Sequence, residues 1–309
     1  MDQLAIYEQL ITFIKPENIK PNEALKNYTH TKTGGHADFL LLPSTYEEAQ
    51  KIVQFTYENN IPLTMLGNGS NLIVKDGGIR GIVLHLHHLS SIRLSDTKVI
   101  AQSGATIINT SRFALEHSLS GLEFSCGIPG SVGGALYMNA GAYGGEISDV
   151  LEETVVLTKE GQLLTLKRED LELTYRHSSI ATNGYYVLEA TFALKKENYD
   201  HIKSKMDELT FLRESKQPLE YPSCGSVFKR PPGLFAGKLI QDSGLQGKRI
   251  GGAEVSMKHA GFIVNVDNAT ATDYLKLIRF VQNTVKEKFN VELETEVKII
   301  GEDLVTVNK

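Results

Sequence analysis

The chain has 309 residues, of which 41% are hydrophobic and 22% charged, with a net charge of −5 and a pI of about 6.0. This length predicts two or three domains with cores of ordinary size. The acidic balance argues against a nucleic-acid-binding protein, in which a basic patch and a high pI are usual. The two cysteines, Cys126 and Cys224, are too few and too far apart for a disulfide framework or a zinc ribbon. We therefore expect no metal site.

The N-terminal residues show no basic segment followed by an apolar core, so they do not have the pattern of a secretory signal. No apolar run approaches the roughly 18 residues that a membrane span requires. We therefore expect a cytoplasmic protein with neither a membrane nor a nucleic-acid partner.

The first part of the chain has the pattern of an α/β unit. Apolar residues at helical spacing predict a short helix over 4–14. Ser44 and Glu47 have the spacing of a capping box, which predicts a helix running to about Asn59.

A strand over 61–66 then leads into the glycine loop Gly67-Asn68-Gly69-Ser70-Asn71, and the chain leaves this loop as a strand over 72–74. Such a loop at the end of a strand is a common ligand site in α/β units.

The middle of the chain predicts a sheet with one helix over about 106–118. The strand-like segments are 81–86, 98–103, 151–158, 162–166 and 185–194. His85 and His87 would share one face of the first of these strands. Because no acidic or cysteine partner lies near them in the sequence, we interpret this segment as a surface strand rather than as a metal site.

The last part of the chain follows a helix that apolar spacing predicts over about 202–217. Thr270 and Asp273 mark the start of another helix. Residues 291–300 alternate between apolar and charged side chains, which predicts a strand with Glu294 and Glu296 on its polar face.

The stretch Gly127–Gly145 holds seven of the chain's 27 glycines and several apolar side chains. Glycine allows tight turns and close approach of the backbone, and bare N–H groups in such turns bind phosphate. No lysine or arginine occurs between Phe113 and Thr158. We therefore expect backbone amides to hold any phosphate here. The chain has neither a P-loop nor the Gly-x-Gly-x-x-Gly fingerprint, since Leu72 stands where the last glycine of that fingerprint would be.

Three polar positions could carry chemistry, and each also has a structural interpretation. Arg176 offers a planar fork for a carboxylate or phosphate, but it could equally be a surface arginine. Ser226, beside Gly225, could donate a proton or simply form a turn. Glu296 could be a solvated carboxylate, and Glu294 is a competing candidate for its role.

Together these segments resemble the UDP-N-acetylenolpyruvoylglucosamine reductase family, flavoenzymes of peptidoglycan synthesis, and more closely its shorter subtype. The resemblance extends from Thr31 to Val297. Its motifs are Gly67–Asn71, Gly127–Gly134 with Asn139–Gly141, Tyr175–Ser178, and Gly225–Lys229.

This resemblance implies an α+β (mixed α/β) fold of the vanillyl-alcohol-oxidase/PCMH type. A two-part FAD-binding region and a smaller α+β substrate domain would make up the chain. The implied domains are 1–78, joined by the C-terminal strand 291–309, then 79–217, and the substrate domain 218–290.

The resemblance also implies the ligands: FAD bound non-covalently, NADPH as co-substrate, and UDP-N-acetylglucosamine enolpyruvate as substrate, in a protein that we expect to be a monomer. The implied FAD-binding residues are Gly67, Asn68, Gly69, Ser70, Asn71, Gly127, Gly130, Ser131, Gly134, Asn139 and Gly141.

The family's catalytic residues correspond to Arg176, Ser226 and Glu296. Arg176 would stabilise negative charge on the substrate carboxylate, Glu296 would assist by donating a hydrogen bond, and Ser226 would supply the proton. The implied substrate-binding residues are Tyr175, Lys229, Arg230 and Lys238. Arg230 departs from the pattern, because several members have Asn there.

Two other interpretations stay open. The chain could be an oxidase of alcohols or hydroxy acids with the same fold, or a non-catalytic protein that binds flavin or a sugar nucleotide. The combination of Arg176, Ser226 and Glu296 favours the reductase over both.

Overall fold

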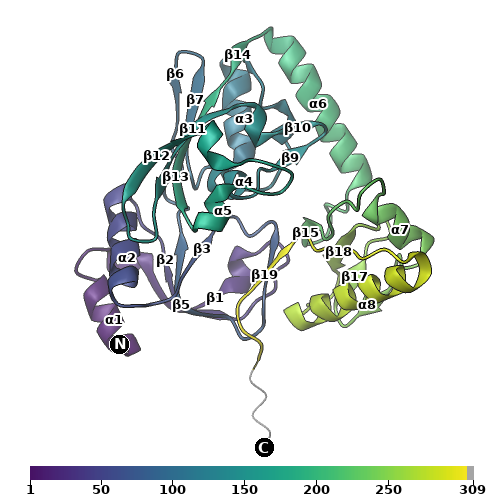
Figure 1. The fold of residues 1–309 in the computed structure, drawn as a ribbon, viewed down its shortest axis with the longest axis horizontal. Helices are drawn as coiled ribbons and strands as arrows, with labels where there is room; N and C mark the ends of the chain where they lie inside the picture. The colour runs from purple at the N-terminus through teal and green to yellow at the C-terminus, as the bar shows by residue number, and fades with distance from the viewer. Residues whose placement is uncertain (305–309) are drawn as a thin grey trace, which may run out of the picture. The chain divides into compact units, whose positions relative to one another are not determined.

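The computed structural model describes residues 1–304, so the last part of the expected C-terminal strand, 305–309, lies outside the described residues (Figure 1). The chain forms two compact units, each assembled from separate segments. The first unit comprises Met1–Pro21, Asp38–Asn68 and Gly81–Arg213. The second comprises Asn22–Ala37, Gly69–Arg80 and the described part of Glu214–Lys309. The division into three domains stays a prediction.

A four-stranded sheet in the N-terminal part of the chain has the order β1-β2-β5-β3, with β3 and β5 parallel. Its strands are β1 (Ile19–Ala24), β2 (His36–Leu41), β3 (Leu63–Leu66) and β5 (Ile79–His85). Helices α1 (Gln3–Leu10) and α2 (Tyr46–Glu58) accompany it (Figure 1). Ile6, Ile52 and Ile82 belong to their common core, as the helical and strand patterns require.

The start of α2 is one residue later than the predicted capping box. The Thr45 hydroxyl accepts from the backbone N–H of Glu48 at 3.1 Å, and the Glu48 carboxylate accepts from the N–H of Ser44 at 2.6 Å. The prediction of Ser44 and Glu47 was therefore wrong. Thr45 and Glu48 have the same capping-box spacing, and it is Thr45 that adopts the extended backbone of an N-cap.

The larger sheet of the first unit is antiparallel, with the order β12-β11-β13-β7-β6. Its strands are β6 (Ile92–Ser95), β7 (Lys98–Gln102), β11 (Leu151–Leu157), β12 (Leu163–Lys167) and β13 (Tyr186–Ala193). Helices α3 (Ile107–Glu116) and α4 (Val132–Tyr137) pack against it and share its core (Figure 1). The four predicted strands and α3 are confirmed, whereas the mostly exposed β6 was not predicted.

The interpretation of the His85 segment as a surface strand was wrong. β5 lies between β2 and β3, and the His85 side chain is only 8% exposed. The strand ends at His85, so His87 lies beyond it and the two histidines do not alternate along one strand.

Small elements complete the first unit. They are β8 (Leu119–Ser120) paired with β14 (Lys195–Lys196), β9 (Gly141–Ala142) paired with β10 (Gly145–Glu146), and the short helix α5 (Ser179–Asn183). Helix α6 (Tyr199–Lys216) begins in the first unit and ends in the second, and it confirms the helix predicted over about 202–217.

The second unit contains an antiparallel sheet in the order β15-β18-β17-β16. Its strands are β15 (Ser223–Ser226), β16 (Arg249–Ile250), β17 (Ala253–Val255) and β18 (Phe262–Asn265). Helices α7 (Ala236–Asp242) and α8 (Ala271–Phe289) lie beside this sheet, with Tyr274 and Leu277 fully buried in the core (Figure 1). Thr270 and Asp273 form the predicted capping box of α8.

The C-terminal segment is less regular than the predicted strand over 291–300. The strand β19 covers only Lys298–Ile300 and pairs in parallel with β4 (Leu72–Val74). Ile299 is 38% exposed and does not share the buried face of Leu293 and Val297. The last strand nevertheless lies beside β4, the segment that follows the first glycine loop.

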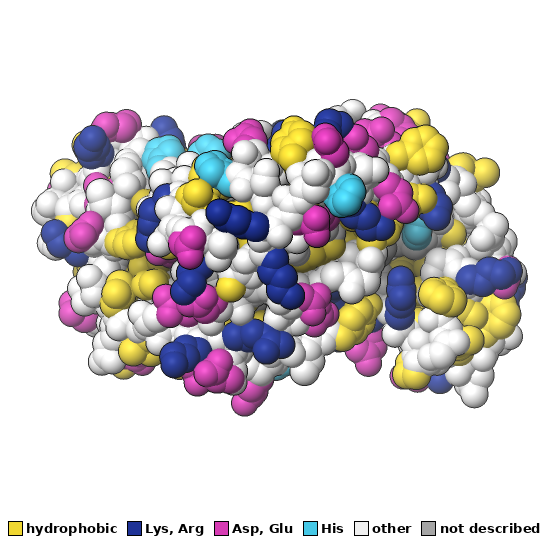
Figure 2. Space-filling model, turned by 90° about the horizontal axis from the view of Figure 1, so that it is seen from above, with side chains coloured by type: hydrophobic (Ala, Val, Ile, Leu, Met, Phe, Trp, Pro, Cys, Tyr) yellow, Lys and Arg dark blue, Asp and Glu magenta, His cyan; other side chains and the backbone are white. Residues whose placement is uncertain are grey.

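No helix within residues 1–304 combines the length and apolarity needed to cross a membrane. Figure 2 shows acidic and basic side chains intermixed over the face in view.

Candidate functional site

The two glycine-rich segments lie against each other in the first unit. A Cβ on Gly67 would lie 2.8 Å from Ser131 Oγ, so a larger residue at position 67 would displace that hydroxyl. Asn68 Nδ2 donates to the carbonyl oxygen of Pro129 at 3.4 Å. These contacts bring together two segments that the sequence identified separately as phosphate-binding candidates.

Several side chains of the second glycine segment are buried, including Val132, Ala135 and Leu136, which is unlike a solvated linker. Ser131 caps α4, and its hydroxyl accepts from the N–H of Gly134 at 3.2 Å. The carbonyl of Gly130 accepts from the N–H of Ile107 at 3.0 Å, at the start of α3. A Cβ on Gly133 would lie 2.1 Å from Ser103 Oγ, so close packing requires glycine there.

The rest of the first glycine loop belongs to the second unit. Gly69 has a φ of +63°, and its carbonyl accepts from the N–H of His30 at 3.0 Å. Asn71 Nδ2 donates to the carbonyl of Glu296 at 3.3 Å. Of the predicted cofactor residues in this loop, Gly67 and Asn68 belong to the first unit, whereas Gly69, Ser70 and Asn71 belong to the second.

Asn139 is fully buried and uses both ends of its side-chain amide on the backbone of the first unit. Its Oδ1 accepts from the N–H of Ser148 at 2.9 Å, and its Nδ2 donates to the carbonyl of Thr174 at 3.1 Å. These bonds give Asn139 a structural function beside the predicted role in cofactor binding: it anchors the residues just before Arg176.

Arg176 lies on a tight turn with a φ of +57°, a conformation that a residue with a side chain rarely adopts. Thr174 and His177 exchange backbone hydrogen bonds of 3.2 and 3.1 Å across this turn. The Arg176 guanidinium donates to the carbonyl of Gly141 at 3.1 Å and lies 5.0 Å from the ring centre of Tyr175. These contacts fix the position of the guanidinium beside Gly141.

Ser226 and Glu296 come together in the second unit. The N–H of Glu296 donates to the carbonyl of Val227 at 2.8 Å, and the N–H of Lys229 donates to the carbonyl of Glu294 at 2.9 Å. The exposed Ser226 side chain lies at the end of β15, directly after Gly225. Gly225 has a φ of +74° and open space around its missing Cβ, so its backbone conformation, not packing, favours glycine.

The predicted substrate cations already have partners within the second unit. Lys229 forms an ion pair with Glu294 at 3.1 Å, and Lys238 pairs with Asp242 on α7. The Arg230 guanidinium lies 5.3 Å from the ring centre of Phe235. Substrate binding by these residues stays a prediction. The pair with Lys229 also gives Glu294, the competitor of Glu296, a structural explanation.

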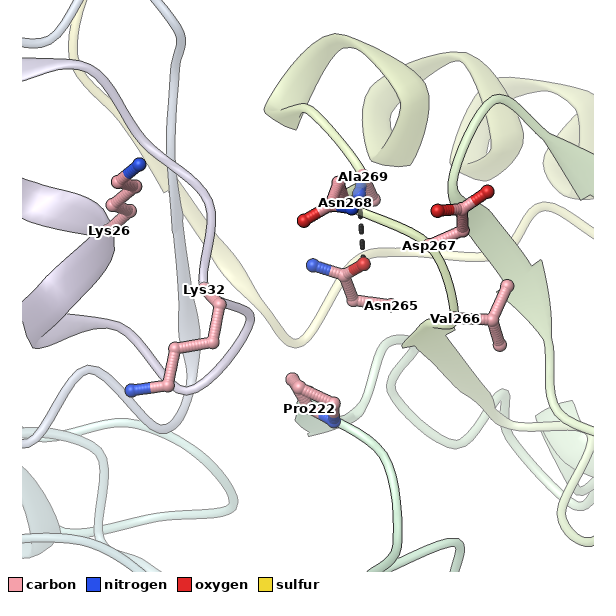
Figure 3. Close-up of a pocket in the computed structure, with 8 residues that line it drawn as sticks. All are labelled: Lys26, Lys32, Pro222, Asn265, Val266, Asp267, Asn268 and Ala269. Atoms are coloured by element: carbon pink, nitrogen blue, oxygen red, sulfur yellow. Dashed lines mark hydrogen bonds between the residues drawn. The ribbon is translucent and has the colours of Figure 1, made fainter.

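A polar pocket of about 500 Å³ lies in the second unit, and sequence reasoning did not point to it (Figure 3). It is lined by Lys26, Lys32, Pro222 and the turn 265–269. Asn265 donates to the carbonyl of Thr31 at 2.9 Å and accepts from the N–H of Ala269 at 2.8 Å, which ties the two walls together. None of the predicted site residues lines this pocket.

Two titratable side chains adjoin the predicted motifs. Burial, together with the neighbouring His87, lowers the pKa of His85 to about 4, and His85 hydrogen-bonds to the backbone of Gly67. Burial raises the pKa of the Cys224 thiol to about 12, so this thiol is unreactive at neutral pH. Within residues 1–304, no three His, Cys, Asp or Glu side chains are arranged to hold a metal ion.

The antiparallel sheet, the paired glycine segments and the separate α+β unit define an FAD-binding flavoprotein of the vanillyl-alcohol-oxidase/PCMH type. A family model described as "FAD binding domain" matches residues 37–167. The structure of Phl p 4, a grass pollen allergen with glucose dehydrogenase activity, has a TM-score of 0.51 at 12% identity over 64% of this chain and 45% of the allergen, a likeness of fold alone. Gly67, Gly130 and Gly134 are partly accessible and carry no side chain, so their backbone groups fit a cofactor that the main chain holds.

A second family model, "UDP-N-acetylenolpyruvoylglucosamine reductase, C-terminal domain", matches residues 217–300. The reductase of Listeria monocytogenes serotype 4a is 68% identical over 92% of this chain and 96% of its own length. The reductase of Oceanobacillus iheyensis is 65% identical over 97% of this chain and 98% of its own length. The crystal structure of the Thermus caldophilus reductase has a TM-score of 0.78 at 36% identity and covers 90% of this chain and 97% of its own. The chain belongs to the UDP-N-acetylenolpyruvoylglucosamine reductase family, and its cofactor is FAD.

Proposed function

We propose that this protein reduces UDP-N-acetylglucosamine enolpyruvate to UDP-N-acetylmuramate, with NADPH as the reductant. FAD, held by the backbone of the two glycine segments, would supply the hydride transfer from NADPH to the terminal carbon of the enolpyruvyl double bond. The hydride and one proton together saturate that bond. Relatives named UDP-N-acetylenolpyruvoylglucosamine reductase align with nearly the whole chain, which supports the proposal.

Arg176 would stabilise the negative charge that develops when the hydride adds to the double bond. This charge spreads into the substrate carboxylate, and a guanidinium offers two parallel N–H donors to such a group. The turn that carries Arg176 is held by Asn139 and by the carbonyl of Gly141. A cation held in place in this way can stabilise the transition state without reorganising first.

Ser226 would donate the proton to the carbon next to the carboxylate, and Glu296 would donate a hydrogen bond to the charged intermediate. The observation that carries this assignment is the bond between Glu296 N–H and the Val227 carbonyl, at 2.8 Å. It places two polar residues from distant motifs next to each other on the main chain.

The test is an anaerobic titration of the purified holoprotein followed by its visible spectrum. We expect NADPH to bleach the flavin band and the enolpyruvyl sugar nucleotide to restore it. A band that returns only with oxygen would identify an oxidase instead. A flavin that NADPH does not reduce would contradict the proposed reductase.

A further inference from the structure

Helix α6 brings an arginine to the cation-free glycine segment. The segment from Phe113 to Thr158 has no lysine or arginine of its own. Arg213, near the end of α6, fills the space beside Gly127: a Cβ added to Gly127 would lie 2.5 Å from Arg213 Cδ and 3.3 Å from its Nε. The side chain of Arg213 therefore lies directly on the glycine segment.

Arg213 has no anionic partner within residues 1–304. Its guanidinium forms no hydrogen bond or ion pair with any of these residues. The titratable groups whose charge would affect its pKa are Tyr143 and Cys126. Burial also lowers the pKa of the Arg213 guanidinium. A largely buried cation without a counter-ion is unfavourable, so a positive charge in such a place is best explained by an anion that binds there.

The backbone does not require glycine at position 127. The φ angle of Gly127 is not in the positive range that favours glycine, so a residue with a side chain could adopt this conformation. The nearest atoms that an added Cβ would meet all belong to Arg213. Gly127 and Arg213 are therefore complementary: the missing side chain of one makes room for the guanidinium of the other.

We propose that Arg213 binds the diphosphate of FAD and that Gly127 is glycine so that the guanidinium can reach it. An arginine fork matches the paired oxygens of a phosphate. The glycine segment that begins at Gly127 continues to Ser131, which lies against Gly67 of the first glycine loop. An anion bound by Arg213 would therefore lie near the two segments proposed to hold FAD. This inference rests on the FAD-binding part of the function and not on the reduction of the sugar.

The first experiment measures FAD binding to protein from which the flavin has been removed. We compare Arg213→Met and Arg213→Lys with Arg112→Met, a change of an exposed arginine on α3. Arg213→Met should weaken the Kd for FAD about 10- to 100-fold, as expected for a hydrogen bond to a charged group. Arg213→Lys should lie between Arg213→Met and the unchanged protein, and Arg112→Met should have no effect.

The phosphorus NMR spectrum of bound FAD identifies the part of the cofactor that is contacted. In Arg213→Met saturated with FAD, the diphosphate resonances should move while the visible flavin band stays unchanged. Unmoved phosphorus resonances, or a shifted flavin band alone, would overturn the proposal. So would an unchanged Kd for FAD accompanied by a raised KM for NADPH, because the anion would then belong to a substrate.

A double-mutant cycle with Gly127→Ala provides the second test and does not depend on Arg213→Met folding well. Gly127→Ala alone should weaken FAD binding by a factor similar to that of Arg213→Met. In an Arg213→Ala background it should add little, because the clashing side chain is gone. Equal losses in both backgrounds would contradict the pairing. Neither measurement uses the sugar nucleotide, so a failed reduction assay would leave this result unaffected.

Discussion

The backbone N–H of Glu296 donates a hydrogen bond of 2.8 Å to the carbonyl oxygen of Val227, the residue that follows Ser226. Asn71, from the first glycine loop, donates to the carbonyl of Glu296 at 3.3 Å. Both bonds use main-chain groups of Glu296, its N–H in the first and its carbonyl in the second. Its side chain, and that of Ser226, can therefore be replaced while these bonds remain, which makes both positions suitable for functional tests.

Replacing Ser226 by Ala should separate the two half-reactions. Flavin reduction by NADPH should stay near normal, because the proposed proton transfer belongs to the second step. Reoxidation by the enolpyruvyl sugar nucleotide should slow about 10²- to 10⁴-fold, the usual contribution of a general acid. Stopped-flow absorbance of the flavin measures both steps, and Ser223→Ala on the same strand is the control. An equal loss in both steps would contradict the assignment of Ser226 as the proton donor.

Replacing Glu296 should show whether it acts as a hydrogen-bond donor. An amide can still donate, so Glu296→Gln should keep more of the second half-reaction than Glu296→Ala does. The matched control is Glu294→Gln, which removes a carboxylate that is ion-paired to Lys229 at 3.1 Å. This control should leave the rate within about threefold, because surface ion pairs contribute little. Identical rates for the two Glu296 variants would count against the proposed donor.

Local patterns predicted the elements that local interactions determine. The capping box of α8 and the apolar stripe of α6 are confirmed because each depends on residues a few positions apart. The same rule misplaced the start of α2, since both Ser44 and Thr45 have an acidic residue three positions later. The backbone conformation of Thr45 decided between them.

The features that were missed depend on contacts between distant segments. The alternating pattern over 291–300 predicts one strand, but backbone hydrogen bonds with Val227 and Lys229 hold the middle of this segment. Only Lys298–Ile300 pairs with β4. His85 is buried because β5 has a neighbouring strand on each side. Arg213 lies 86 positions after Gly127 in the sequence, and no motif connects them.

Asn139 should contribute to stability through its two backbone hydrogen bonds. Asn139→Ala leaves the N–H of Ser148 and the carbonyl of Thr174 without their present partner. Leaving a buried polar group unsatisfied costs about 1–3 kcal/mol, so we expect a loss of that order in the free energy of unfolding. Urea unfolding of the apoprotein measures it, with Asn109→Ala on α3 as the control. Unchanged stability combined with loss of FAD would assign Asn139 to the cofactor alone.

His85 should make the protein less stable as the pH falls. Burial lowers its pKa from 6.5 to about 4, so between these values the unfolded chain binds a proton that the folded protein does not. The stabilisation is complete above about pH 6.5 and is lost as the pH falls toward 4, with a total of up to about 3 kcal/mol. His85→Gln cannot titrate, so its free energy of unfolding should fall less between about pH 7 and about pH 5 than that of the unchanged protein. Urea unfolding at both pH values measures the difference, with the exposed His117→Gln as the control. The same pH dependence in His85→Gln and the unchanged protein would show that other groups cause it.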